Sequence, residues 1–206
     1  MSSIEKLTEL FGQFPGIGPR QSKRFVYFLL TRNNGFIKEF AELILGLKDE
    51  IIICSSCFRF FPKEKGASSL CSICRDNGRD ESLLMIVARD IDVENVERSG
   101  SFHGLYFIIG GTIPILEKEP EKRVRAKELV SIIKEKIKSK KLKEIILAMN
   151  LNPEGENTAD YIRRLLEPTT LAPKLKISTL GRGLSTGTEL EYSDPETLKN
   201  ALKNRA

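Results

Sequence analysis

The chain has 206 residues, of which 40% are hydrophobic and 30% charged, and this globular composition excludes a disordered protein. No apolar run approaches the roughly 20 residues that a membrane-spanning helix needs. The start Met1-Ser2-Ser3-Ile4-Glu5 lacks a signal-peptide pattern, so we expect a cytoplasmic protein. The net charge of +5 is explained equally well by a polyanionic partner and by a lysine-rich solvated surface.

Three amphipathic helices are predicted in the first quarter of the chain. Apolar residues recur at helical spacing over residues 3–13, and a second helix begins near Pro19, whose missing N–H suits a first helical position. After Asn33-Asn34-Gly35, residues 36–48 predict a third helix. Its apolar residues are expected to face inward: Phe40, Ile44 and Leu47.

The turn between the first two helices has the pattern of a phosphate-binding hairpin. Gly16 and Gly18 allow a sharp turn that can approach a phosphate closely, and the next helix start offers free N–H groups. Arg20, Lys23 and Arg24 gather at that helix start, where the helix dipole disfavours cations, which indicates an anionic partner. The pattern favours a helix-hairpin-helix motif that binds the sugar–phosphate backbone of DNA. A plain helical hairpin turn is the alternative.

Four cysteines form two matched pairs. Cys54 and Cys57 make one C-x2-C pair, and Cys71 and Cys74 make another after 13 intervening residues. Two residues between cysteines let both thiolates reach one ion, and two such turns complete the tetrahedron of soft ligands that zinc prefers. A redox pair or an iron–sulfur site would explain a single pair, but two matched pairs favour one structural zinc ion per chain.

Short apolar runs alternate with helical patterns in the rest of the chain. Strands are predicted at 83–87, 105–109, 144–149 and 175–179, and helices at 91–98, 121–139 and 158–167. Continuous apolar strands suit a parallel sheet covered on both faces, so the alternation predicts an α/β layer. The tail predicts a short strand at 189–192 and a capped helix from Asp194-Pro195 onward.

Taken in order along nearly the full chain, these parts resemble the RecR family of bacterial recombination mediators. The resemblance is carried by Pro15-Gly16-Ile17-Gly18-Pro19, the four cysteines, Glu97-Arg98-Ser99-Gly100, Ile146-Leu147-Ala148-Met149-Asn150, Glu154-Gly155-Glu156 and Thr188-Glu189-Leu190-Glu191-Tyr192. It implies an α+β multidomain chain. Its parts would be a helix-hairpin-helix DNA-binding and oligomerisation region (1–52), a four-cysteine zinc finger (53–76), an α/β Toprim domain with a parallel sheet (80–176), and a C-terminal strand–helix oligomerisation segment that swaps between subunits (177–206).

Catalytic Toprim domains carry a glutamate after the first strand and an Asp-x-Asp after a later one, and these carboxylates hold Mg²⁺ for phosphoryl chemistry. Here the corresponding positions are Ala88 and Asn150-Leu151-Asn152, which lack the carboxylates. We therefore expect no enzymatic activity. Ala88 departs even from the glutamate expected in the RecR family, and Asp90 and Asp92 could replace part of that negative charge from the following helix.

The resemblance implies a DNA repair and recombination mediator that forms a ring-shaped homotetramer. Such proteins act with RecO and RecF to load the recombinase RecA on gapped DNA. In this chain the DNA contacts would be Gly16, Gly18, Arg20, Lys23 and Arg24, and RecO would dock near Glu154 and Glu156. The two glutamates are equally well explained as acidic residues that favour a helix start near Thr158.

Two other functions fit parts of the pattern. A Mg²⁺-dependent Toprim nuclease or primase would use the same fold, and the missing carboxylates disfavour it. A zinc-ribbon module of transcription or translation would have the same cysteine spacing without affinity for DNA.

Three further features receive structural interpretations. The lysine run from Lys134 to Lys143 favours a solvated helix end over a second DNA contact. The segment 181–187 favours a flexible connection, because it lacks the Gly-Lys-Ser/Thr ending of a nucleotide P-loop. His103 has no nucleophile nearby in the sequence and is interpreted as structural.

Overall fold

The computed structural model describes residues 1–63, 66, 68–167, 175–181, 183, 184, 187 and 189–203, apart from the side chain of Glu196. The chain divides into two compact units, 1–52 and 53–206, and each has its own fold. Among the described helices, none combines the length and the apolar character that a bilayer crossing requires.

The first unit consists of three helices, as predicted: α1 (Ser3–Gly12), α2 (Pro19–Leu30) and α3 (Asn34–Glu50). A capping box starts α1, because Ser2 Oγ accepts from Glu5 N–H and the Glu5 carboxylate accepts from Ser2 N–H. The rings of Phe11 on α1 and Phe25 on α2 pack edge to face, with centroids 5.6 Å apart.

The apolar faces of this unit are largely uncovered within one chain. Val26 is its single buried hydrophobic residue, and α3 has none. The expectation that Phe40, Ile44 and Leu47 face inward is therefore wrong for the isolated chain, where 39%, 55% and 59% of their surfaces are exposed. Helical periodicity identifies an apolar face but does not identify what covers it.

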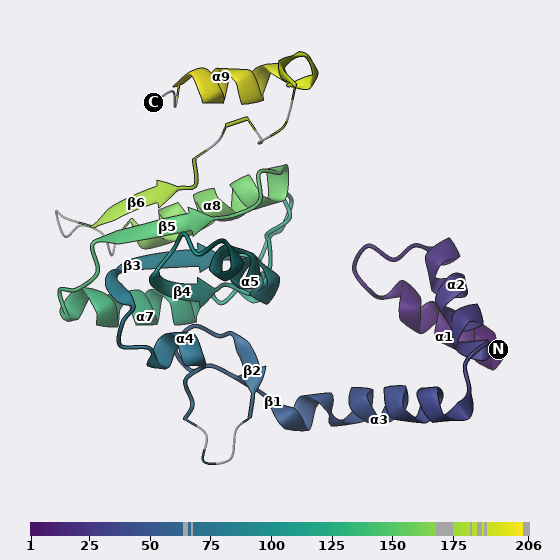
Figure 1. Cartoon of the computed structure of the whole chain (residues 1–206). Coiled ribbons are helices and arrows are strands. Elements are labelled where there is room, and N and C mark those ends of the chain that lie inside the picture. Colours follow the sequence, from purple (N-terminus) through teal and green to yellow (C-terminus); the bar gives the residue numbers. More distant parts are fainter. Residues whose placement is uncertain are drawn as a thin grey trace. The chain divides into compact units, whose positions relative to one another are not determined.

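The second unit is built on a parallel sheet of four strands. Its strands are β3 (Asp80–Val87), β4 (Gly104–Ile108), β5 (Glu144–Ala148) and β6 (Lys176–Thr179), in the order β4-β3-β5-β6 (Figure 1). In the register, Met85 lies between Tyr106 and Ile146. The predicted α/β layer and its strands are confirmed.

Helices and the cysteine module cover the two faces of this sheet. One face packs against α7 (Ala126–Lys138) and α8 (Pro153–Leu166), in a core that contains Leu84, Ile86, Phe107, Leu129, Ile133, Ile145, Leu147 and Ile162. The other face packs against α5 (Asp90–Ser99) and the cysteines, in a core that contains Met85, Val87, Val93, Tyr106 and Ile108. Continuous burial of β3 on both faces explains its uninterrupted apolar run.

Two predicted helices have different bounds. The helix expected at 121–139 is divided into α6 (Pro120–Arg123) and α7, because Arg125 N–H donates to Ile109 O at 2.8 Å and holds the chain against the end of β4. The helix expected at 158–167 begins earlier, at Pro153, because the Asn152 side chain caps it by accepting from Gly155 N–H at 2.8 Å.

The tail contains a short 3₁₀ helix, η1 (Leu190–Tyr192), and a helix, α9 (Pro195–Lys203). The strand predicted at 189–192 is therefore wrong, whereas the capped helix is confirmed. Its cap is Asp194, whose carboxylate accepts from the N–H and the hydroxyl of Thr197. Of the glycine-rich segment 181–187, Arg182, Ser185 and Thr186 lie outside the described residues, as does Thr188.

Candidate metal centre and nucleic-acid interface

The two cysteine pairs lie in tight turns of different backbone conformation. Cys54 follows β1 (Ile51–Ile53), which pairs with β2 (Phe60–Pro62), and its N–H donates to Arg59 O at 2.8 Å. The turn closes through Phe58 N–H, which donates to Cys54 O at 3.0 Å. Cys71 precedes the short helix α4 (Ser72–Arg75), so Cys74 lies one turn along on the same side.

The four sulfurs lie at distances suited to one metal ion. All four lie within 4.8 Å of one another, and the Cys57 and Cys71 sulfurs are 3.6 Å apart. A tetrahedral ion with bonds of about 2.3 Å to sulfur would place its ligands about 3.8 Å apart. Cys71 N–H donates to Cys54 Sγ at 3.4 Å, which is the kind of contact that orients a thiolate ligand.

The thiol groups affect one another's protonation strongly. Hydrogen bonding from Cys57 lowers the pKa of the Cys54 thiol, and the same contact raises the pKa of Cys57. Four sulfurs this close cannot all be thiolates without a cation, because like charges in a buried site repel. A divalent ion would replace the shared protons and let all four ionise.

The cysteine module is attached directly to the edge strand of the sheet. Ile108 N–H at the end of β4 donates to Cys57 O at 2.9 Å. Phe58 adopts a left-handed backbone, with φ of 63°, and its ring packs on Phe107 with centroids 5.3 Å apart. The Arg125 guanidinium lies 5.3 Å from the centroid of the Phe58 ring and donates to Ile108 O at 3.0 Å. The module therefore contacts both faces of the sheet around the edge of β4.

A half-buried polar cluster joins the segment after the cysteines to α5 and β4, and Arg79 at its centre also lies 3.6 Å from the Asp76 carboxylate. The Arg79 guanidinium forms a bidentate pair with Glu97 on α5, and Nη1 lies 2.8 Å from Oε1. Tyr106 on β4 donates its hydroxyl proton to the same carboxylate at 2.6 Å. The pKa of the Glu97 carboxyl is lowered, and the hydrogen bond from the Arg79 guanidinium is the largest cause.

We expect the Arg79–Glu97 pair to contribute about 1–3 kcal/mol to the free energy of unfolding near pH 7. A double-mutant cycle with Arg79→Met and Glu97→Gln, measured by urea unfolding, gives this coupling energy. Because the pKa of Glu97 is lowered in the folded state, its stabilisation is fully present above about pH 4.3 and is lost as the pH falls through the folded pKa. A coupling that already fades between pH 8 and pH 6 would contradict this assignment.

The carboxyl edge of the sheet lacks the ligands of a catalytic Toprim site. Ala88 is buried and directly follows β3, and the Asn152 amide is occupied as the cap of α8. Asp90 and Asp92 lie in the first turn of α5, as expected, and accept from the N–H groups of Phe60 and Arg89. Among the described residues, the four cysteines are the one group of three or more acidic, histidine or cysteine side chains close enough to hold a metal ion.

The hairpin presents cations at a helix start that has no acidic residue. Gly16 has a φ of 75°, and Gly18 is the N-cap of α2 without a side-chain cap. A side chain added at either glycine would meet no atom within 4 Å, so the turn is open to a ligand. Arg20, Lys23 and Arg24 are exposed, and no carboxylate among the described residues pairs with them.

Comparison with known proteins identifies the family. The family model described as the Toprim domain matches residues 82–180, and the one described as RecR, C-terminal, matches residues 183–206. The recombination protein RecR of Lacticaseibacillus casei is 33% identical over 203 residues, which cover 98% of this chain and 96% of that protein. That of Chloroflexus aggregans is 36% identical over 202 residues, 98% of this chain and 92% of that protein. The chain belongs to the RecR family.

The family architecture agrees with the structure: N-terminal helices, a four-cysteine metal site, a Toprim domain with a four-stranded parallel sheet, and a RecR C-terminal segment. The four predicted cysteines lie together, and the three hairpin cations lie along the first turns of α2. The two predicted glutamates differ in their surroundings. Glu154 is exposed and accepts from the Thr112 hydroxyl at 3.0 Å, which links α8 to the loop after β4.

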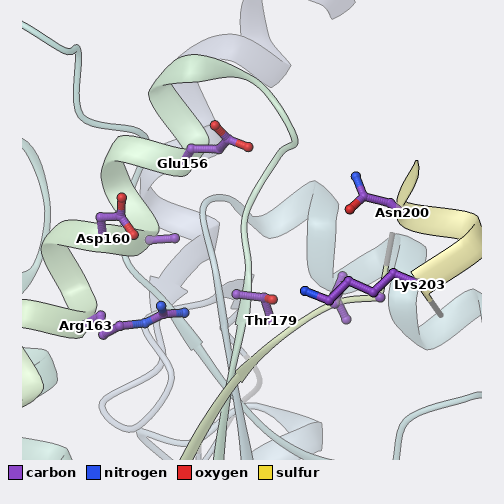
Figure 2. A pocket seen from close by; sticks show the side chains of 9 residues that line it. Glu156, Asp160, Arg163, Thr179, Asn200 and Lys203 are labelled. Atoms are coloured by element: carbon purple, nitrogen blue, oxygen red, sulfur yellow. The ribbon is translucent and has the colours of Figure 1, made fainter. Parts of the chain in front are cut away.

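Glu156 borders a pocket of about 580 Å³ between α8, the end of β6 and α9. Figure 2 shows Glu156, Asp160 and Arg163 on α8 at one side of this pocket and Asn200 and Lys203 on α9 at the other. The walls carry both signs of charge, so the pocket has no clear preference for an anion or a cation.

Sequence reasoning missed three residues that position this RecR-family site. Phe58 and Arg125 lock the cysteine module to β4, and neither belongs to a motif. Gly155 lets α8 approach the end of β5, because a side chain there would lie 2.0 Å from Asn150 O. A glycine between two glutamates indicates a close approach at this position, but the sequence does not indicate that Asn150 is the residue approached.

Proposed function

We propose that this chain is a non-catalytic mediator of recombination and repair that binds DNA without sequence preference. The observation that carries the proposal is the open hairpin turn beside exposed cations at the start of α2. Relatives over nearly the full length named recombination protein RecR support it. Action on chromosomal DNA places the protein in the cytoplasm.

The hairpin can bind a phosphate through both backbone and side chains. Pro19 is the first residue of α2, so the N–H groups of Arg20 and Gln21 have no partner within the helix and point toward its start. Gly16 and Gly18 leave room for a sugar–phosphate strand, and Arg20, Lys23 and Arg24 neutralise its charge. Such contacts position a strand and do not read its bases.

The metal is zinc in this proposal, with a structural role. All four ligand positions are filled by protein, which leaves none for substrate or water. The ion holds the turn at Cys57 in the geometry that caps β4.

Assembly explains the uncovered apolar helices of the first unit. Phe36, Phe40, Leu43, Ile44 and Leu45 are all more than a third exposed on α3, and monomeric proteins rarely leave apolar faces this large in water. A ring-shaped homotetramer, joined through the N-terminal helices and through C-terminal segments that swap between subunits, would cover them. Several hairpins in one ring would multiply the phosphate contacts.

Within the repair pathway the chain would act with RecO and RecF to load RecA on gapped DNA. Glu154 and Glu156, in the first turn of α8, are the proposed contacts for RecO, and Glu154 is exposed there. Their position at a helix N-terminus is also favoured by the helix dipole.

Replacing Arg20 and Arg24 together with alanine is expected to weaken binding to plain duplex DNA roughly tenfold or more at low salt. Each lost phosphate contact removes counterion release, so the slope of log affinity against log salt falls by about 0.9 per contact. Fluorescence anisotropy with a labelled oligonucleotide measures both quantities.

The control is Lys63→Ala with Lys118→Ala, which removes the same charge from exposed positions in the second unit. Unchanged affinity in the Arg20/Arg24 variant would remove the hairpin from the mechanism. Strand cleavage or primer synthesis on addition of Mg²⁺ would favour a Toprim enzyme instead.

A further inference from the structure

A line of lysines runs along the solvent side of α7, far in sequence from the hairpin. Lys127, Lys134, Lys138 and Lys140, called here the α7 lysine surface, are all exposed. None of them has an ion-pair partner among the described residues. Two neighbouring lysines differ in this respect, because Lys141 pairs with Glu81 and Lys176 pairs with Glu144.

Helical geometry places these lysines in one row. Positions 127, 134 and 138 are spaced by seven and four residues, so their directions from the helix axis fall within about 40° and they span about 16 Å. Lys140 lies two residues beyond the helix end, where its backbone turns into the left-handed region with φ of 57°. The buried Leu129 and Ile133 fix the opposite side of α7 against the sheet, so the row faces solvent.

Helix stabilisation accounts for only part of this arrangement. Lys138 lies in the last turn, where a cation favours the helix dipole, but Lys127 lies in the first turn, where the dipole opposes it. Glu128 and Glu135 lie on the neighbouring line of the same helix and would repel a polyanion there. A negatively charged polymer is therefore confined to the lysine row.

The space beside the cysteine module, at the end of α7, has a different character. A pocket of about 400 Å³ there is lined by Ser55 and Ser56 but also by the carboxylates of Glu81 and Glu135. The α7 lysine surface therefore does not include this pocket.

The absence of apolar anchors favours a nucleic acid over a protein or a membrane. None of the exposed large hydrophobic side chains of the described residues falls within 126–143. Protein interfaces centre on buried aromatic, apolar or arginine anchors, and membrane-bound helices insert an apolar face. A row of lysines has only solvated point charges, which suit a phosphate backbone.

We propose that the α7 lysine surface is a second contact for the DNA backbone. It belongs to the second unit, whereas the hairpin belongs to the first. The inference rests on the proposed DNA binding and adds a second site to each chain. A strand that reaches both sites would gain affinity because the second contact becomes intramolecular.

The test compares two triple variants of the full-length protein with equal net charge. Lys127→Gln, Lys134→Gln and Lys138→Gln remove the row, and Lys63→Gln, Arg98→Gln and Lys118→Gln remove three exposed charges elsewhere. Binding to a mixed-sequence single-stranded oligonucleotide is measured against potassium chloride concentration. We expect the row variant to lose at least tenfold in affinity and about two units of salt slope, at about 0.7 per contact. The control should change less than threefold.

The outcomes separate this inference from the proposed function. If the wild type fails to bind DNA at low salt, the proposed function and this inference are both wrong. If binding depends on Arg20 and Arg24 but the row variant behaves as its control does, the α7 lysine surface is not a contact. A matching triple lysine-to-arginine variant should retain binding, which distinguishes lost charge from lost folding. Polyglutamate serves as a probe for an acidic protein partner. If the row variant loses binding to polyglutamate but keeps full DNA binding, the surface binds an acidic protein and the proposal is overturned.

Discussion

Replacing Cys57 with serine is expected to abolish tight zinc binding and to lower the unfolding midpoint of the second unit by about 10 °C or more. A structural zinc contributes several kcal/mol to folding, and each kcal/mol shifts the midpoint by about 2–4 °C in a domain of this size. The effect should extend beyond the metal, because Cys57 O accepts from Ile108 N–H at the end of β4. Phe58 next to it packs on Phe107 in the main core.

Metal analysis and calorimetry on the same samples measure this effect. The wild type should contain one zinc ion per chain and the variant much less, and a chelator should reproduce the variant's midpoint in the wild type. The matched control is Ser55→Ala, on the same turn but outside the ligand set, which should keep both the metal and the midpoint. Iron in the purified protein, or a full midpoint without metal, would exclude a structural zinc.

Replacing Gly155 with alanine is expected to cost about 3 kcal/mol of unfolding free energy, an effect at the upper end for overpacking. The added carbon would lie 2.0 Å from Asn150 O and 2.9 Å from Asn150 C, so either α8 or the end of β5 must move. Movement of α8 would also disturb the cap from Asn152 and the contact from Thr158 to Ile113 N–H.

Urea unfolding gives the loss, and Gly181→Ala is the control, because a side chain there meets no atom within 4 Å. The zinc content of the Gly155 variant should stay at one per chain, since its damage lies on the opposite sheet face from the cysteines. A cost below about 1 kcal/mol would mean that α8 and β5 adjust without strain.

Sequence patterns were sufficient where local chemistry determines the structure. Two C-x2-C pairs predicted the sulfur cluster because the spacing itself brings thiolates together, and the apolar runs at 83–87 and 105–109 predicted buried parallel strands. The hairpin helices followed from Pro19 and the breaks beside it.

The patterns failed where the decisive contact is distant in sequence. The helix expected at 121–139 is interrupted because Arg125 N–H finds Ile109 O, and no local residue announces that bond. The predicted start of α8 is five residues late, because the cap from Asn152 places Pro153 in the first turn of the helix. The inward orientation of Phe40 and Leu47 was wrong because their cover, on our proposal, belongs to another subunit.

The attachment of the cysteine turn to β4 also has a consequence for solubility. β4 is an outer strand of the sheet, and exposed edge strands are templates for pairing with other chains. The bond from Ile108 N–H to Cys57 O occupies the last donor of that strand and places the folded turn beside it. In cells starved of zinc, the protein is therefore expected to aggregate through pairing of its β4 edge strands before unfolded monomer accumulates.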